Sequence, residues 1–304
     1  MPDKKQNPGE ILVGMDGSLP AQRTGKLAIQ IASNLNLSIR GIYVVEDEFF
    51  TKRNSASHAE STRDRELKNR RDSMDRLRLK GESCLTWLEK QCQIANVSMT
   101  RDLFYGSVTE VLTREASVAS MLALGKRGEG HKRDTHTLGS NFRAIINRVR
   151  KPLLVGGERK RPLRKILFIE KSRRDISKTL TLVVSLQRSI HSGLIGLDIQ
   201  KNNIAMQAGL SEIMTEFHEI GITDYLLIGR AGRSVAEIAA TARRNSADLI
   251  VMRIDRSPAM LKWLTGSTLG GFLMAMTLPM LLIHEYGLIH KIDFEPEDRY
   301  VVNT

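Results

Sequence analysis

The sequence is poor in cysteine, in aromatic residues and in long apolar runs. Two cysteines in 304 residues exclude a disulfide framework, and no Cys/His cluster has the spacing of a zinc site. Cys84 and Cys92 share one helical pattern and lie about 12 Å apart along its axis, too far to form a disulfide bond. Aromatic residues make up 5% of the chain, which is few for a protein that stacks on single-stranded nucleic acid.

No apolar run approaches the ~18 residues that a membrane-spanning helix needs. The opening segment, MPDKKQNPGE, has no apolar core of the kind found in signal peptides. Together with the low cysteine content, these absences predict a cytoplasmic protein with no membrane span.

Positive charge is what the sequence has in excess. Its 46 Lys and Arg residues outnumber 34 Asp and Glu residues, giving a net charge of +12. This balance indicates an anionic partner, which could be a nucleotide, a nucleic acid or an acidic lipid. The scarcity of aromatic residues disfavours nucleic acid without excluding it. A mixed-charge run at 63–80 is typical of a solvated helix face, with a docking arm for nucleic acid or lipid as the alternative.

Strand and helix patterns alternate regularly along the first half of the chain. Such alternation predicts an α/β fold with a parallel, doubly wound sheet, in which ligands bind at the carboxyl ends of the strands. The expected strands are 10–15, 39–45, 97–105, 121–124 and 152–156, and the expected helices are 20–36, a long one through 67–88, 108–119 and 139–149.

The second half repeats this pattern. RKILFIEKS answers EILVGMDGS, and ADLIVMRIDRSPAMLKWLTGS answers ASMLALGKRGEGHKRDTHTLGS. We therefore expect an internal duplication, with domains over residues 1–157 and 158–304, the second of which includes a C-terminal tail. The fifth strands, PLLVG and PMLLI, are apolar edge strands that would be protected by pairing with each other.

Several of these segments, in their order and spacing, resemble the universal stress protein family in its tandem two-domain form. They are VGMDGS, YVV, GSVTEVL, SADLIVM and the glycine loop ending in GS. The resemblance implies two Rossmann-like domains of the adenine nucleotide alpha hydrolase-like type, each a five-stranded parallel sheet flanked by helices. It also implies pairing of the two halves through their fifth strands, as an intramolecular pseudo-dimer, and a regulatory role in the stress response. Whether two chains also form a homodimer is left open by the sequence.

The resemblance further implies binding of ATP, or of AMP or ADP, which Mg²⁺ could accompany. The family's glycine pattern matches Gly125, Gly128 and Gly139-Ser140, except that ten residues separate the last two glycines where the family has nine. Glycine permits backbone shapes closed to other residues, and a helix N-terminus favours anions. Lys126, Arg127, Lys132 and Arg133 add positive charge. The alternative is a basic loop in which Ser140 is a plain helix cap.

Other candidate site residues follow from the same resemblance. Asp16 would accept a hydrogen bond from adenine or ribose, the backbone of Val44 would read the adenine edge, and Gly106 would lie under the ribose. Their ordinary alternatives are a turn aspartate, a core residue and a residue at a helix cap. The candidate nucleotide-binding residues are Asp16, Val44, Gly106, Gly125, Arg127, Gly128, Gly139, Ser140 and Asn141.

The glycine loop is altered in the second half. Arg253 and Arg256 replace its two loop glycines, and Glu170 aligns with Asp16. Because arginine has a side chain at Cα, the second half is not expected to bind ATP in the family's manner. The two arginines could hold a different anion, or they could pair at the surface with Asp255 or Glu170.

No catalytic constellation is evident in the sequence. It has no Walker A motif, no G-x-S-x-G elbow and no paired carboxylates with a partner base. His131 and His136 lack a third ligand, so no metal site is expected. At most we expect slow ATP hydrolysis or self-phosphorylation at Ser140. The alternative function is a nucleotide-free binding module whose basic surface engages a protein, nucleic acid or lipid.

Overall fold

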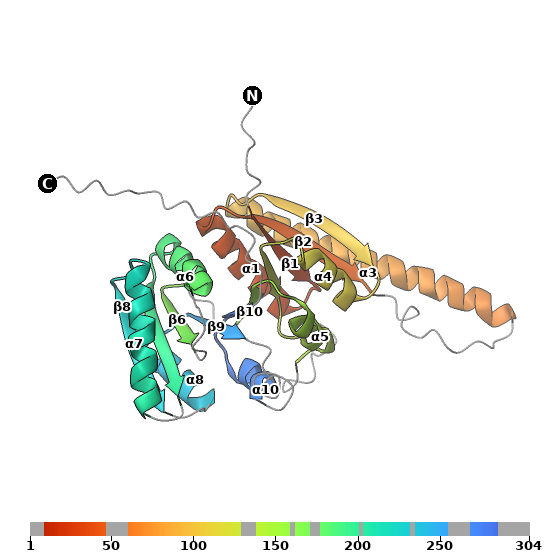
Figure 1. Ribbon diagram of the computed structural model, residues 1–304. Helices are drawn as coiled ribbons and strands as arrows, with labels where there is room; N and C mark the ends of the chain where they lie inside the picture. The colour runs from red at the N-terminus through yellow and green to blue at the C-terminus, as the bar shows by residue number, and fades with distance from the viewer. Residues whose placement is uncertain are drawn as a thin grey trace.

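The computed structural model describes residues 9–46, 60–128, 138–158, 162–170, 177–200, 203–231, 235–254 and 268–284. Figure 1 shows the described elements, in which a single sheet carries helices on both faces. The strands of this sheet are β1 Glu10–Met15, β2 Ser38–Val45, β3 Met99–Tyr105, β4 Met121–Leu124, β5 Leu153–Val155, β6 Lys165–Glu170, β7 Gly193–Gln200, β8 Tyr225–Ala231, β9 Leu249–Ile254 and β10 Met280–His284.

The sheet order is β3-β2-β1-β4-β5-β10-β9-β6-β7-β8. We call residues 9–158 the N-terminal half and residues 162–284 the C-terminal half. Strand pairs within each half are parallel. β5 and β10 pair antiparallel, with Leu154 opposite Leu281. The carboxyl edge of the N-terminal half therefore lies beside the amino edge of the C-terminal half.

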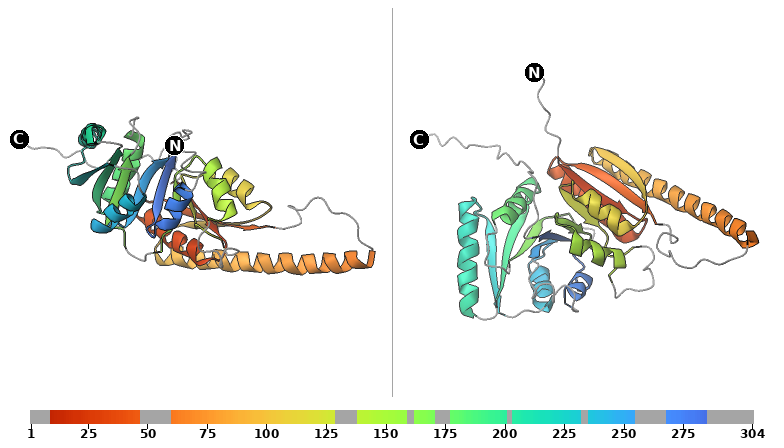
Figure 2. Two further views of the ribbon diagram at one scale, coloured as in Figure 1. Left: turned by 90° about the horizontal axis from the view of Figure 1, so that it is seen from below. Right: turned by 45° about the vertical axis from the view of Figure 1, so that its right-hand side comes forward.

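Eight helices of the described residues cover the sheet. The side-chain clusters place α1, α3, α6 and α7 on one face and α4, α5, α8 and α10 on the other. Figure 2 shows the amino-terminal part of α3 extending well past the sheet. The helices are α1 Leu19–Asn34, α3 Glu60–Ile94, α4 Val108–Ala116, α5 Ser140–Arg148, α6 Ser177–Ser189, α7 Asn203–Glu219, α8 Val235–Arg244 and α10 Thr268–Ala275.

The core follows from the alternation of apolar residues along the strands. In β1, Ile11 and Val13 belong to the cluster under α1 and α3, whereas Leu12 belongs to the cluster under α4 and α5. Each cluster continues through both halves, so that Ile31 and Phe217 belong to the same one. These observations confirm the expected Rossmann-like α/β class, and the two halves share their hydrophobic cores.

No helix among the described residues combines the length and the apolar character needed to cross a bilayer.

Candidate functional site

A cavity of about 520 Å³ lies at the carboxyl edge of the N-terminal half. Strands β1, β2 and β4 end beside it, and α3, α4 and α5 supply further walls. Because β1 is flanked by β2 and β4 and the chain order reverses there, the cavity occupies the switch point of the sheet. Eight of the nine predicted site residues line it: Asp16, Val44, Gly125, Arg127, Gly128, Gly139, Ser140 and Asn141.

Gly106 is not among the lining residues. It follows β3, has a φ of +130°, and its amide donates to the carbonyl of Val45 at 3.1 Å. The next residue, Ser107, caps α4 by accepting a hydrogen bond from the amide of Glu110 at 3.4 Å. In this structure the Gly106-Ser107 pair therefore turns the chain from β3 into α4.

Asp16 stands at the entrance to α1. Its Oδ1 accepts a hydrogen bond from the amide of Ser18 at 2.8 Å, which is ordinary Asx-turn chemistry. Its other oxygen faces the glycine loop, since a Cβ placed on Gly128 would stand 3.0 Å from Asp16 Oδ2. Asp16 thus serves the turn and still presents one oxygen to the cavity.

The loop after β4 is held against the first turn of α1. Ser18 caps α1 by accepting from the amide of Ala21 at 3.2 Å, and its hydroxyl donates to the carbonyl of Arg127 at 3.4 Å. A Cβ on Gly125 would stand 2.9 Å from the Ala21 amide nitrogen. Gly125 is therefore required by close packing of two backbone segments.

The predicted reason for the loop glycines needs correction. Positive φ among the described glycines occurs at Gly17, Gly106 and Gly221, and Gly125, Gly128 and Gly139 do not adopt it. Their common property is the absence of a side chain where space is short or where the cavity lies. A Cβ on Gly139 would stand 3.6 Å from the Gly128 amide nitrogen, which is an ordinary contact without a clash.

Helix α5 presents an uncapped N-terminus to the cavity. Its N-cap residue is Gly139, which makes no side-chain capping bond, so the alternative of Ser140 as the cap is wrong. Ser140 is exposed in the first turn, and Asn141 Oδ1 accepts a hydrogen bond from Thr109 Oγ1 at 3.3 Å. The amides of this first turn therefore remain available to an anion.

The two described basic residues of the loop point in different directions, and only Arg127 points where it was expected. Lys126 is buried, and its Nζ donates to the carbonyl of Met276 in the C-terminal half. Burial lowers the pKa of Lys126 to about 8, with Arg127 lowering it further and Glu158 opposing the shift. Arg127 lines the cavity, and its Nη2 lies 3.7 Å from Met274 Sδ. Lys132 and Arg133 lie outside the described residues, as do His131 and His136.

Three polar lining residues were missed by the sequence analysis: Tyr43 and Glu46, around the end of β2, and Lys80 of α3. Lys80 approaches the turn after β1, where a Cβ on Gly17 would stand 3.1 Å from its Cε. Burial raises the pKa of Tyr43 to about 12, with contributions from Cys84 and Asp16. Spacing along α3 could have indicated Lys80, because Leu77 and Cys84 flank it on the packed side of the helix.

The C-terminal half places an ion pair where the glycine loop would begin. Arg253 Nη2 lies 3.5 Å from Glu170 Oε1, and their side chains are only 5% and 6% exposed. The sequence analysis offered an arginine paired with Glu170 at the surface as an alternative. The partner is confirmed, but the pair is buried and not at the surface. Arg256, Asp255 and the Gly266-Ser267 pair lie outside the described residues.

The strand register also corrects one alignment. Ile11 of β1 pairs with Met121 of β4, whereas Ile166 of β6 pairs with Leu249 of β9. These two pairs make Ile166 the equivalent of Ile11. Glu170, four residues after Ile166, is therefore the equivalent of Met15 and not of Asp16. A shift of one residue moves a strand side chain to the opposite face, so Glu170 is turned into the fold.

Within the described ranges, no group of three or more His, Cys, Asp or Glu side chains is placed to hold a metal ion.

Comparison with known proteins gives a family for the N-terminal half. Residues 9–155 match the sequence profile of the Universal stress protein family. A search of curated proteins found no match.

Solved structures resemble nearly the whole chain. A universal stress protein from Archaeoglobus fulgidus DSM 4304 is similar with a TM-score of 0.70 and 13% identity, covering 91% of this chain and 97% of that one. A functionally unknown protein from Pseudomonas aeruginosa PAO1 gives 0.59 and 11%, covering 90% and 92%. The cytoplasmic domain of a prokaryotic cation chloride cotransporter gives 0.53 and 13%, covering 92% and 98%. At these identities the likeness establishes the fold alone.

Proposed function

Residues 9–155 belong to the universal stress protein family, and from this premise we propose that the chain is a cytoplasmic stress-response regulator. In this proposal the N-terminal half binds ATP or a related adenine nucleotide, and the domains extend over residues 1–157 and 158–304. The C-terminal half is a partner with a degenerate nucleotide loop. The observation that carries the proposal is the cavity at the switch point, which eight of the nine candidate residues line.

The phosphate end of the nucleotide would lie against the glycine loop and α5. The first-turn amides of α5 have no side-chain cap, and the cavity also contains Gly128 and Gly139, which keep backbone accessible. Arg127 Nε is buried and has no hydrogen-bond partner among the described residues, although the side chain lines the cavity. A buried donor of this kind gains most from an anionic acceptor.

The nucleoside end would lie nearer β1 and β2. Asp16 presents Oδ2 to the cavity and is placed to accept from a ribose hydroxyl or the adenine amine, and Val44 supplies backbone at the end of β2. Lys80 of α3 adds a cation to the same cavity. Since Mg²⁺ is commonly held by phosphate oxygens and water together with few protein ligands, a dedicated metal cluster is not required.

The C-terminal half would not use its equivalent position in this way. Arg253 corresponds to Gly125, and its guanidinium is directed at Glu170 inside the fold. A side chain there cannot permit the close backbone packing that Gly125 makes against α1. We therefore assign one nucleotide to each chain.

Calorimetric titration of the full chain with ATP and with AMP tests the proposal, together with mass spectrometry of the freshly purified protein for retained nucleotide. We expect saturable binding of one nucleotide per chain. Gly139→Ala should weaken it at least tenfold, because the added methyl group would stand 3.6 Å from the Gly128 amide nitrogen, where a phosphate oxygen would approach, without clashing with the protein.

Two results would contradict the proposal. One is the absence of binding to either nucleotide by folded protein. The other is binding that Gly139→Ala leaves unchanged. Salt-sensitive binding of DNA or RNA by protein that binds no nucleotide would instead support the alternative function, a nucleotide-free binding module whose basic surface engages its partner.

A further inference from the structure

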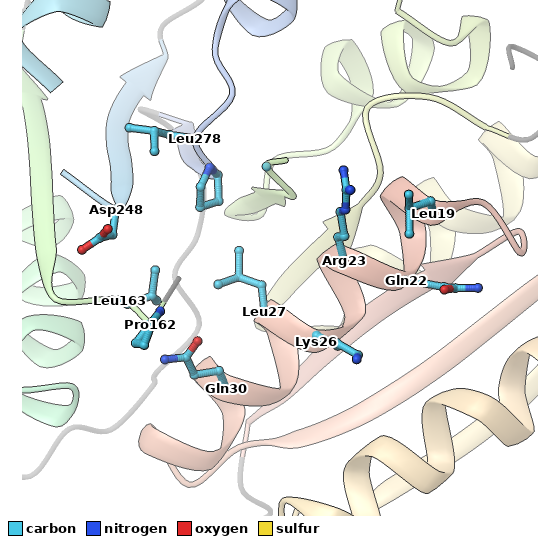
Figure 3. A pocket seen from close by; sticks show the side chains of 12 residues that line it. Leu19, Gln22, Arg23, Lys26, Leu27, Gln30, Pro162, Leu163, Asp248 and Leu278 are labelled. Carbon is cyan, nitrogen blue, oxygen red and sulfur yellow. The ribbon is translucent and has the colours of Figure 1, made fainter. Parts of the chain in front are cut away.

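A second and larger cavity, of about 600 Å³, lies between the two halves. Its size falls within the range of roughly 300–1,000 Å³ that is typical of small-molecule sites. It shares no lining residue with the cavity at the switch point. The helix α1 forms one wall, and the amino edge of the C-terminal half forms the other (Figure 3).

The α1 wall follows from the spacing of its residues. Leu19, Arg23 and Leu27 recur every fourth position and form one stripe along the helix. This stripe lies beside the face that α1 buries against its own sheet, which includes Ala28 and Ile31. Figure 3 shows Arg23 and Leu27 projecting from α1 on the side that faces Leu163 and Leu278.

The opposite wall is apolar at its centre and is fixed in place. Leu163 and Leu278 are 4% and 5% exposed. The chain entering this wall is pinned to the segment before β10, because the amide of Glu158 donates to the carbonyl of Thr277 at 2.8 Å. A Cβ on Gly157 would stand 2.6 Å from that same carbonyl oxygen. The cavity is therefore bounded by packed elements.

Arg23 is the polar group that this cavity leaves without an acceptor. Its Nε is buried and has no hydrogen-bond partner among the described residues, while the side chain lines the cavity. Lys26, also on the α1 wall, already lies over the ring of Trp87, with Nζ 5.8 Å from the ring centroid. On the far wall, Asp248 Oδ2 accepts from the amide of Arg164 at 3.1 Å. The unmet requirement in this cavity is thus an anion at Arg23.

From these contacts the geometry points to a ligand site between the halves for a small molecule with an apolar body and one anionic group. The apolar body would pack between Leu27 and the pair Leu163 and Leu278. The anionic group, a carboxylate or a sulfonate, would accept from the Arg23 guanidinium. This site is separate from the proposed nucleotide site and does not depend on it.

Fluorescence titration of the full chain with anilinonaphthalene sulfonate, an apolar aromatic anion, tests this inference. We expect saturable binding, displaced by decanoate and displaced much less by decanol, which has the same apolar body without the charge. Arg23→Gln should weaken binding of the probe roughly tenfold, since it removes a charge-assisted hydrogen bond. Leu27→Trp should weaken it independently by occupying the space for the apolar body.

Lys90→Gln is the matched control, because Lys90 is an exposed cation on α3 away from this cavity, and it should leave the titration unchanged. Thermal melting identifies any variant that fails to fold. Because Arg23→Gln and Leu27→Trp are tested independently, one folded variant is enough to test the inference. The inference is overturned if folded wild-type protein shows no saturable binding. It is also overturned if both folded variants bind the probe as wild type does, or if decanol competes as well as decanoate.

Discussion

Gly125 lies directly against the backbone of Ala21, so that a Cβ at Gly125 would stand 2.9 Å from the Ala21 amide nitrogen. This contact joins the loop after β4 to the first turn of α1. The same two segments are joined again by the hydroxyl of Ser18, which donates to the carbonyl of Arg127. The described start of this loop, residues 125–128, is therefore fixed by packing before any ligand arrives.

Gly125→Ala should destabilise the fold, whereas Gly139→Ala should have a smaller effect. The first adds a methyl group against backbone atoms, which cannot move aside easily, at a cost of about 1–3 kcal/mol. The second adds a methyl group with ordinary contacts, and costs less than about 1 kcal/mol through the poorer helix cap. Urea unfolding of both variants measures the difference. Equal midpoints for the two would show that the Gly125 contact is not a close one.

Lys126→Met should change how stability depends on pH. Because the pKa of Lys126 falls from 10.5 to about 8 on folding, the unfolded chain binds more protons between these values. Wild-type stability should therefore rise relative to Lys126→Met as the pH increases from 8 to 10, approaching a total of about 3 kcal/mol.

Comparing wild type with Lys126→Met separates the contribution of Lys126 to the pH dependence of stability from that of other groups. Tyr43, whose pKa rises to about 12, and Cys92, whose pKa rises to about 11, both lower stability at higher pH. They do so equally in wild type and variant. Parallel stability curves for the two proteins between pH 8 and 10 would show that Lys126 keeps an ordinary pKa.

The buried pair of Arg253 and Glu170 should behave as a unit. Removing one charge leaves the other inside the fold, so Arg253→Met alone should cost about 3–5 kcal/mol. Adding Glu170→Gln to this variant should recover much of the loss, because no charge is then left in the buried pair. A double-mutant cycle by denaturant unfolding measures the coupling. Additive losses would mean that the two side chains do not stabilise each other.

Lys80→Met should weaken ATP binding about tenfold without changing stability much, because Lys80 lines the cavity as a cation from α3. Lys90→Met provides the control on the same helix, since Lys90 is exposed and lines neither of the two cavities. Calorimetric titration compares the two variants. A loss of affinity shared equally by both would indicate a general effect of charge rather than a contact.

The order of strands and helices in the N-terminal half was predictable, because apolar alternation and helical spacing are local signals. β1, for example, covers the expected residues 10–15 without a shift. The position of Glu170 was not predictable to one residue, because the register depends on pairing with β9 across the sheet.

The candidate site was predictable where motif residues are adjacent in sequence, as at Gly139 and Ser140. Lys80 was missed because the spacing along α3 shows which side of the helix is packed, but the cavity that this side borders is decided by the tertiary fold. Lys126 was misplaced for a related reason. Its charge is visible in the sequence, but its direction depends on the carbonyl of Met276, 150 residues away.

A crystal structure of the full chain grown with saturating ATP and Mg²⁺ tests the central claim most directly. The account predicts nucleotide density in the cavity of the N-terminal half, with phosphate oxygens within hydrogen-bond distance of amides at Gly128 and in the first turn of α5. An empty cavity under these conditions, or nucleotide density found only beside Arg253 in the C-terminal half, would contradict it.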